Sequence, residues 1–184
     1  MPAGLSRQKE LEIIKKAQKN LHHFSILYEQ YFEKVYKFFH FRLRDEELSK
    51  DLTSETFEKI VTKLHTYEDQ GYPFSSWIFR IARNAMIDHI RAQQSKHTTS
   101  LEELLPSQQP FTTFDPAVID NQSALAKVKD VIKTLPQLQQ DIWGLKLASD
   151  LSHRDIANIL GISENYVNVS LFRSIKVIKS KLIR

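Results

Sequence analysis

The 184-residue sequence contains no cysteine, which excludes disulfides, iron–sulfur clusters and thiolate zinc sites. It has only four glycines, and no Asn-Gly or Asp-Gly turns separate alternating apolar segments. Because glycine destabilises the interior of a helix, its scarcity favours an all-α protein. No apolar run is long enough to span a bilayer, and residues 1–20 are polar and charged. We therefore expect a cytoplasmic protein with neither a signal peptide nor a membrane-inserted segment.

The sequence also lacks the patterns that indicate an enzyme. It contains no glycine-rich phosphate loop and no nucleophile elbow, and its seven histidines show no spacing typical of metal ligands. We expect no catalytic residue, no metal site and no cofactor. The formal net charge of +4 suits nucleic-acid binding, although many proteins with such a charge bind none.

Apolar residues at helical spacing predict four helices in the first part of the chain. These helices span residues 5–20, 24–41, 45–64 and 74–93. Asp45 is the predicted N-cap of the third helix, and a loop from His65 to Pro73 precedes the fourth. The first helix lies in an N-terminal extension, residues 1–23. Two interpretations of this extension stay open. In the first, it has a role, either by packing on the following domain or by recruiting a partner. In the second, it is a frayed, solvated segment.

The composition changes between residues 95 and 121, where Ser, Thr, Gln and Pro dominate and apolar periodicity is absent. This segment is predicted to link a first domain, residues 24–94, to a second domain, residues 122–184. The predicted helices of the second domain span residues 123–134, 136–148, 152–160 and 163–181. Pro136 occupies the predicted first position of its helix, where proline is favoured.

Residues 152–173 have the pattern of a helix-turn-helix. Ser152 and Ser163 are the predicted N-caps of its two helices, and Gly161 stands where the first helix would end in the left-handed conformation. In a DNA-binding helix-turn-helix, the second helix enters the major groove. A simple helical hairpin within a bundle is the alternative.

Aromatic and basic residues are concentrated in the loop after residue 65 and in the helix that follows. The aromatic members are Tyr67, Tyr72 and Phe74, and the polar members on one helical face are Arg80, Arg83, Asn84 and Arg91. Arginines on one face can pair with phosphates, and aromatic rings beside them can stack on unpaired bases. From the residues alone, an aromatic core with a solvated basic face is an equal alternative.

The chain resembles the extracytoplasmic-function sigma factors of bacterial RNA polymerase in two separate parts. Their first conserved domain, sigma region 2, is similar to the segments LYEQYFEKVYKFFHFRLRD, DLTSETFEKI and PFSSWIFRIARNAMIDHIR. Their second conserved domain, sigma region 4, is similar to LPQLQQDIWGLKLASDLSHRDIANILGIS. The resemblance implies an all-α fold of two small helical domains, the second carrying the helix-turn-helix, joined by a flexible linker. It also implies that the protein binds core RNA polymerase and promoter DNA, and directs promoter recognition, promoter opening and transcription initiation.

The resemblance further implies which residues make these contacts. The segment that docks on a coiled coil of the largest polymerase subunit would act through Asp51, Leu52, Glu55 and Phe57. Capture of a flipped base of the minus-ten element would involve Tyr67, Tyr72, Phe74, Trp77, Arg80, Arg83 and Asn84. The helix-turn-helix would contact the minus-thirty-five element through Ser163, Asn165, Tyr166, Asn168, Val169, Ser170 and Arg173.

The predicted recognition helix departs from the family pattern. Asn168 and Ser170 stand where the family commonly has basic residues, so that Arg173 is the main positive group. Several apolar side chains lie outside the expected apolar seam of this helix, namely Val169, Phe172, Ile175 and Val177. A helix that is apolar on more than one face tends to be covered. The helix therefore either binds its element weakly or is covered by an anti-sigma factor or another partner until it is released.

Two other functions compete with that of a sigma factor. A stand-alone helix-turn-helix regulator is disfavoured by the DLTSETF segment, because such a protein has no use for a polymerase-docking surface. A sigma-like coregulator that acts through protein contacts is compatible with the depleted recognition helix.

Overall fold

The computed structural model describes residues 6–94 and 122–182, and within these residues every regular element is a helix. The chain divides into two compact units, residues 1–101 and 102–184. The expectation of an all-α fold is therefore confirmed. The predicted linker, residues 95–121, lies outside the described residues, and the predicted domain boundaries stay predictions.

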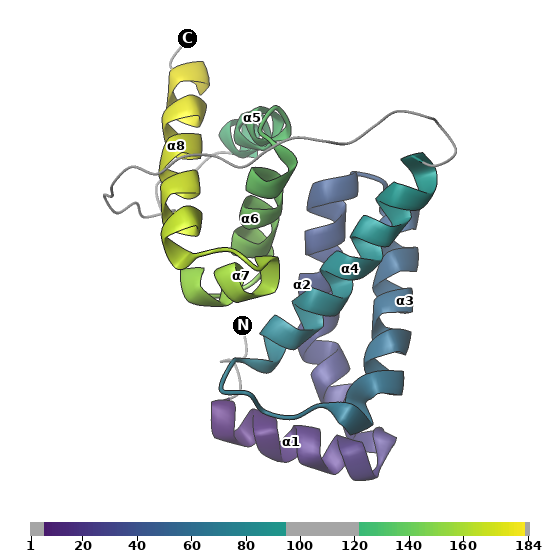
Figure 1. Ribbon diagram of the computed structural model, residues 1–184. Helices are drawn as coiled ribbons and strands as arrows, with labels where there is room; N and C mark the ends of the chain where they lie inside the picture. Colours follow the sequence, from purple (N-terminus) through teal and green to yellow (C-terminus); the bar gives the residue numbers. More distant parts are fainter. Residues whose placement is uncertain (1–5, 95–121, 183–184) are drawn as a thin grey trace. The chain divides into compact units, whose positions relative to one another are not determined.

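The first unit is built from four α-helices and two short 3-10 turns. The helices are α1 (Arg7–Lys19), α2 (Phe24–Leu43), α3 (Glu46–Lys63) and α4 (Phe74–Gln94), and the turns are η1 (Leu21–His23) and η2 (Leu64–Thr66). Figure 1 shows α2, α3 and α4 grouped together, with α1 lying across one end of the group beneath the loop that leads to α4. The loop therefore passes beside α1, which also contacts α2 directly.

The core of the first unit is formed largely by aromatic side chains on the inner faces of α2, α3 and α4. Phe38, Phe39 and Phe79 are fully buried, and the ring of Phe79 meets that of Phe38 edge-on at 5.8 Å. The turn from α2 to α3 is tight, because Arg44 adopts the left-handed conformation (φ 59°) and Asp45 then caps α3. The Asp45 carboxylate accepts a hydrogen bond from the Leu48 N–H at 3.0 Å, which confirms the predicted cap.

Helix α1 packs against the first unit along a buried face. Ile14 and Ala17 are almost fully buried, and Glu10, a charged residue, is only 6% exposed. The Glu10 carboxylate accepts a hydrogen bond from the Tyr31 hydroxyl on α2 and a longer one, 3.5 Å, from the Gln30 amide. A carboxylate tolerates burial when it is hydrogen-bonded in this way. The interpretation of the N-terminal segment as a frayed, solvated extension is therefore wrong for α1.

The second unit contains α5 (Gln122–Lys133), α6 (Gln137–Ala148), α7 (His153–Leu160) and α8 (Glu164–Leu182). Ser152 and Asp155 form a reciprocal capping box at the start of α7. Gly161 ends α7 in the left-handed conformation (φ 68°), and the Ser163 hydroxyl accepts from the Tyr166 N–H at 3.1 Å. The predicted caps of the helix-turn-helix are thus confirmed. Pro136 precedes the first residue of α6 by one position and acts as its N-cap residue.

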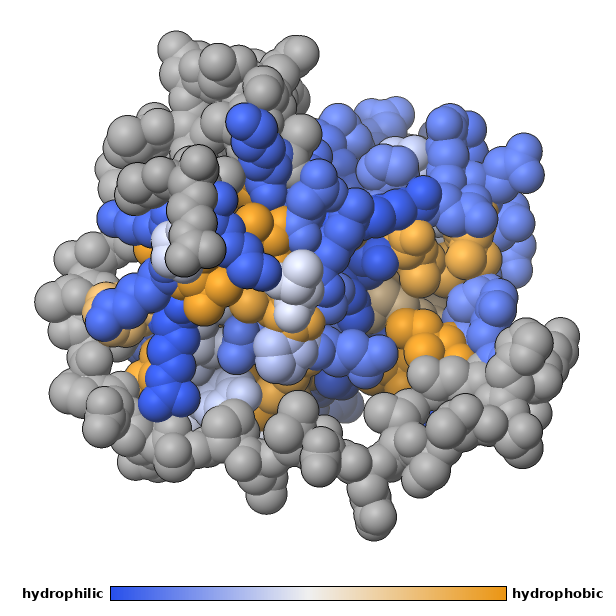
Figure 2. Space-filling model, turned by 90° about the horizontal axis from the view of Figure 1, so that it is seen from above, coloured by the Kyte–Doolittle hydropathy of each residue, from blue (hydrophilic) through white to orange (hydrophobic). Residues whose placement is uncertain are grey.

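The surface of the described residues carries both polar and apolar side chains. Hydrophilic side chains dominate the face shown in Figure 2, and apolar groups appear there in small areas between them. The large apolar side chains that the described surface exposes are Leu21, Ile26, Tyr28, Leu147 and Val177. Leu21, Ile26 and Tyr28 fall within eight positions of one another at the beginning of α2 and the turn before it, so part of that region presents an apolar surface.

Replacing Glu10 with Ala should lower the free energy of unfolding of the first unit by about 1–3 kcal/mol, because the buried Tyr31 hydroxyl loses an acceptor. Glu10→Gln keeps a side-chain oxygen at this position and should lower the free energy of unfolding by less than Glu10→Ala. Urea unfolding in a Trp143→Phe background measures the effect, because Trp77 is then the only tryptophan. Equal unfolding free energies for Glu10→Ala and its parent would contradict the prediction.

Candidate protein and nucleic-acid interfaces

The segment expected to dock on polymerase forms two distinct faces of α3. Asp51 and Glu55 are exposed one helical turn apart, and the Glu55 carboxylate pairs with Lys59 at 2.6 Å. Leu52 and Phe57, by contrast, are each only 4% exposed. The two acidic residues therefore form an accessible surface, whereas Leu52 and Phe57 face the interior and are not available for extensive contact. This corrects the expectation that all four residues contribute directly to a surface.

A partly exposed aromatic side chain of α2, outside the expected site residues, contacts α3 at Phe57. The ring of Tyr28 on α2 is 40% exposed and meets the ring of Phe57 edge-on at 4.8 Å. Phe32 is half-buried and lies 5.9 Å from Phe57. The signal was present in the sequence, because Tyr28 and Phe32 are separated by four positions and fall beside the buried stripe of Leu27, Tyr31 and Val35.

Three aromatic residues around the loop before α4, Tyr67, Phe74 and Trp77, form one cluster. Tyr67 contacts Phe74 and Trp77 edge-on, with ring centroids 4.9 and 5.2 Å apart, and Phe74 stacks on Trp77 at 5.4 Å. Phe74 is 1% exposed and belongs to the core, whereas Tyr67, Tyr72 and Trp77 are half-buried. Phe74 is therefore a core residue, whereas the other three rings remain partly accessible, and their contact with nucleic acid stays a prediction.

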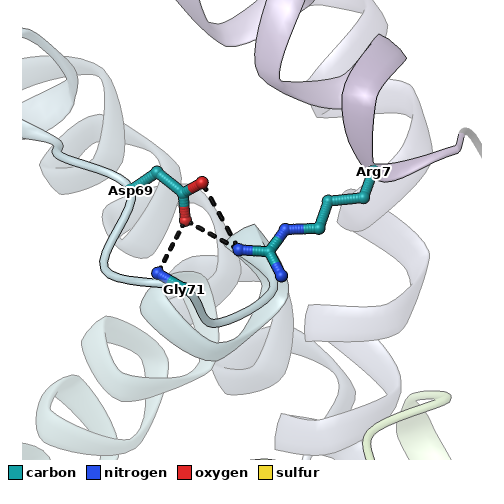
Figure 3. A network of polar contacts seen from close by, with 3 residues as sticks. All are labelled: Arg7, Asp69 and Gly71. Atoms are coloured by element: carbon teal, nitrogen blue, oxygen red, sulfur yellow. Dashed lines mark hydrogen bonds and ion pairs between the residues drawn. The ribbon is translucent and has the colours of Figure 1, made fainter.

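Two polar contacts from α1 reach this loop, and sequence reasoning missed both. The Arg7 guanidinium donates to the Asp69 carboxylate at 3.0 Å, and the same carboxylate accepts from the Gly71 N–H at 2.9 Å (Figure 3). The Gln18 amide donates to the backbone carbonyls of Leu64 and Tyr67 at 3.0 and 2.9 Å. The Asp-x-Gly turn was recognisable as a local signal, but nothing in the sequence pointed to Arg7 or Gln18.

The polar face predicted for α4 is present. Arg80 and Asn84 are exposed one turn apart, Arg91 is exposed further along the helix, and Arg83 is half-buried. Since the aromatic cluster lies at the start of the same helix, rings and basic groups follow one another along α4. Such an arrangement can hold a nucleic-acid strand by stacking on bases and pairing with phosphates.

The predicted contact residues of the helix-turn-helix divide between surface and interior. Ser163, Asn165 and Arg173 are exposed, and Tyr166 is half-buried. Val169 and Ser170 are only 7% and 4% exposed, which corrects the expectation that they line the DNA-facing surface. The reason is that α8 packs against α5, α6 and α7 together, so that its buried face is wider than a single seam.

The surface of α8 also depends on a hydrogen bond of Asn168 and on how far its apolar side chains are buried. The side chain of Asn168 is hydrogen-bonded to the His153 ring on α7, so this residue links the two helices of the motif. The apolar residues outside the seam do not share one environment: Val169 is buried, Phe172 and Ile175 are half-buried, and Val177 is 37% exposed. The Lys176 ammonium nitrogen lies over the Phe172 ring, 4.5 Å from its centroid, in a cation–π contact.

Burial raises the pKa of Tyr67 to about 12, and the nearby carboxylates of Asp69 and Glu10 act in the same direction. Burial also raises the pKa of Tyr166. Both phenols are therefore uncharged near neutral pH and do not repel the phosphates of a nucleic acid.

Within residues 6–94 and 122–182, no group of three or more His, Cys, Asp or Glu side chains could hold a metal ion. In the same part of the chain, no helix combines the length and the apolar character needed to cross a bilayer.

Comparison with known proteins gives consistent matches. The sigma-70 region 2 family matches residues 27–96. The chain is 27% identical over 169 residues to the ECF RNA polymerase sigma factor BldN of Streptomyces coelicolor, covering 91% of this chain and 64% of that protein. It is 28% identical over 158 residues to the ECF RNA polymerase sigma factor SigM of Bacillus subtilis, covering 84% of this chain and 91% of that protein. The chain thus spans slightly less than two thirds of BldN and most of SigM.

Two solved structures are similar in fold. The sigma factor RpoE of Bartonella quintana, in complex with the anti-sigma factor NepR, aligns with a TM-score of 0.64 at 20% identity, covering 86% of this chain and 96% of that one. CnrH, in complex with the cytosolic domain of CnrY, aligns with a TM-score of 0.62 at 20% identity, covering 92% and 94%.

The raised pKa of Tyr67 should appear as a loss of stability in alkaline solution. Unfolded Tyr67 ionises near its ordinary pKa of 10.0, whereas the folded chain keeps this proton up to about pH 12. The stabilisation is therefore complete below pH 10 and is lost as the pH rises toward 12. Tyr67→Phe keeps the ring but removes the titration. Its unfolding free energy, from urea unfolding at a series of pH values, should fall less steeply than that of the parent above about pH 10; equal slopes would refute this.

Proposed function

Because this chain belongs to the extracytoplasmic-function sigma factors, we infer that it binds core RNA polymerase and directs that enzyme to recognise promoters, open them and start transcription. The observation that carries this function is the combination in one unit of an exposed acidic face on α3 and an aromatic-to-basic face on α4. The match of the same unit to sigma-70 region 2 supports the assignment. Promoter DNA and core polymerase are thus its two partners.

The polymerase-docking role is proposed for the exposed carboxylates of Asp51 and Glu55. Leu52 and Phe57 act indirectly, because their buried side chains fix α3 against its neighbours. The partly exposed ring of Tyr28, in contact with Phe57, adds an apolar contact area on α2. An exposed acidic surface of this kind suits a partner with complementary basic groups.

Minus-ten recognition is proposed for the loop before α4 and the first turns of α4. Tyr67, Tyr72 and Trp77 present partly accessible rings on which an unpaired base can stack. Phe74 supports this cluster from the core, and Arg80, Arg83 and Asn84 continue along the helix, where they can contact phosphates and base edges. Because flipping a base costs a few kcal/mol of stacking, the rings must replace part of the stacking that the base loses.

The helix-turn-helix is proposed to bind the minus-thirty-five element through few contacts. Asn165, Tyr166 and Arg173 are accessible, Ser163 caps the helix, and Asn168 is engaged with His153. With Val169 and Ser170 buried, Arg173 is the main cation on this stretch of α8. Few phosphate contacts give weak binding with a shallow salt dependence. We expect this element to contribute less to promoter affinity than the minus-ten element.

Besides binding DNA, the second unit is proposed to be covered by an anti-sigma factor. The surface of α8 combines the exposed Val177 with the half-buried Phe172 and Ile175. RpoE of Bartonella quintana and CnrH, which share the fold, were solved with NepR and with the cytosolic domain of CnrY. An inhibitor that covers this surface would compete with DNA at the neighbouring helix-turn-helix.

We assign no catalytic residue and no cofactor to the chain, because the chemistry of RNA synthesis belongs to the polymerase. The proposed location is the cytoplasm, where a bacterial polymerase works.

Reconstitution separates the proposed function from its competitors. Purified protein is added to bacterial core RNA polymerase with duplex templates randomised over the minus-thirty-five and minus-ten elements. Specific initiation from a selected template supports a sigma factor. Association with the core without initiation would indicate a coregulator, and no association would indicate a stand-alone regulator.

Reversing the charges of the α3 surface should prevent docking. Asp51→Lys with Glu55→Lys should weaken binding to core polymerase by about tenfold or more and reduce initiation in parallel, because the basic partner surface is repelled. The matched control is Glu29→Lys with Glu33→Lys, an exposed pair at the same spacing on α2, in which Glu33 pairs with Lys37 as Glu55 pairs with Lys59. Competition against a labelled sigma factor measures the affinity. Equal losses in both double variants would show that net charge alone matters.

Removing the cation of the recognition helix should flatten the salt dependence of promoter binding. Arg173→Ala should reduce the slope of log K against log salt by about one, because one phosphate contact is lost. The effect is measured with holoenzyme by filter binding over a range of salt concentrations. Lys129→Ala, which removes an exposed cation from α5, is the control and should leave the slope unchanged. A slope unaffected by Arg173→Ala would exclude a phosphate contact at this residue.

A further inference from the structure

We propose that α1 is a positioning element for minus-ten recognition: through Gln18 and Arg7 it holds the loop of residues 67–73 in the conformation that receives an unpaired promoter base. The inference rests on the proposed function, since it gives a role in promoter opening to a helix that precedes the residues matched to sigma-70 region 2. Its basis is the pair of contacts that α1 makes with this loop.

The first contact fixes the beginning of the loop. The Gln18 amide nitrogen donates both of its hydrogens, to the carbonyls of Leu64 and Tyr67 at 3.0 and 2.9 Å. The Leu64 carbonyl also accepts from the Tyr67 N–H at 3.1 Å, which closes the last turn before the loop. One side chain of α1 therefore bridges the two ends of this turn, and the orientation of the Tyr67 peptide is set from outside.

The second contact fixes the middle of the loop. The Asp69 carboxylate accepts from the Gly71 N–H at 2.9 Å, in a turn that needs glycine because φ of Gly71 is +84°. Arg7 donates to both oxygens of the same carboxylate, at 3.0 and 3.3 Å (Figure 3). The residue that shapes the turn is thereby tied to the first turn of α1.

Helix α1 can act as a fixed support because buried residues beside Arg7 and Gln18, on the same side of the helix, anchor it. Ile14 and Ala17 are buried, and Glu10 is hydrogen-bonded to Tyr31 on α2. Gln18 and Arg7 reach the loop from this anchored helix at two points, eleven positions apart in the sequence. The loop is therefore held at its beginning and at its centre by one rigid element.

The consequence for base capture follows from the position of Tyr67. Its backbone carbonyl is held by Gln18, and its ring packs on Phe74 and Trp77 at the start of α4. A loop that is already ordered does not lose conformational entropy when the base enters, so more of the stacking energy appears as affinity. A loop without these contacts must be ordered by the DNA itself, which weakens capture.

The variants that test this proposal leave the buried residues Glu10, Ile14 and Ala17 of α1 unchanged. Gln18→Met keeps the length of the side chain without its donors, and Arg7→Gln removes the ion pair with Asp69. Lys15→Gln is the control for lost charge, because Lys15 is an exposed cation on the same helix. Arg7→Lys is the conservative variant, since it retains a cation that can pair with Asp69.

The measurements use full-length chain bound to bacterial core polymerase and a template selected from the randomised library. The first measurement is the binding of a single-stranded oligonucleotide with the non-template minus-ten sequence. The second is the rate of open-complex formation, which is compared between duplex template and template already melted over this element. Gln18→Met with Arg7→Gln should weaken oligonucleotide binding about tenfold, the effect of ordering roughly one residue of backbone. Opening of duplex should slow in parallel, and Arg7→Lys should recover most of the Arg7→Gln loss.

Affinity for core polymerase should stay unchanged, which a purely structural role of α1 would not allow. The midpoint of urea unfolding should fall only by what the loss of these part-exposed contacts requires, and by less than in Glu10→Ala. The proposal is overturned if the double variant matches Lys15→Gln in oligonucleotide binding, or if its loss is equalled by losses in stability and core affinity. If the unsubstituted chain selects no template at all, the proposed function fails, and this inference fails with it. If the unsubstituted chain initiates transcription and the variants bind the oligonucleotide as it does, only the inference about α1 is wrong.

Discussion

Aromatic packing on α2 is the constraint on which both faces of the first unit depend. Phe57 of α3 meets Phe24 and Tyr28 of α2 edge-on, at 6.3 and 4.8 Å, while Phe79 of α4 meets Phe38 of α2 at 5.8 Å. Edge-to-face rings add orientation to apolar burial, so each of these contacts fixes a helix in rotation as well as in position. The acidic residues of α3 and the polar residues of α4 reach solvent because their helices are seated in this way on a common support.

The two units contribute differently to the proposed recognition. In the first unit, partly exposed rings and basic residues are arranged one after another along α4. In the second unit, packing of α8 on α5, α6 and α7 removes Val169 and Ser170 from the surface and leaves a small polar face around Asn165 and Arg173. Promoter choice by such a protein would rest mainly on reading opened DNA rather than on the major groove of an upstream duplex.

The features that could be predicted from sequence are those decided within a few residues. The caps at Asp45, Ser152 and Ser163 and the left-handed Gly161 follow from local hydrogen bonding and backbone preference, and the structure confirms them. The exposure of individual site residues could be predicted less well, because it depends on how many other helices pack against one face of a helix. Phe57 and Ser170 were expected at a surface and are buried for this reason. The contacts of Arg7 and Gln18 join residues 46 to 62 positions apart, which no local pattern encodes.

The same long separation has a consequence for how the chain acquires its shape during synthesis. The α2–α3 hairpin, closed by the tight turn at Arg44 and Asp45, depends on neighbours in sequence and can form early. Helix α1 is translated before the hairpin, yet the carbonyls and the carboxylate that accept from Gln18 and Arg7 belong to residues 64–69, which are translated after both hairpin helices. Helix α1 can contact Tyr31 of α2 as soon as α2 has been made, but its contacts through Arg7 and Gln18 form only after the loop has been translated, so this helix is secured in two stages.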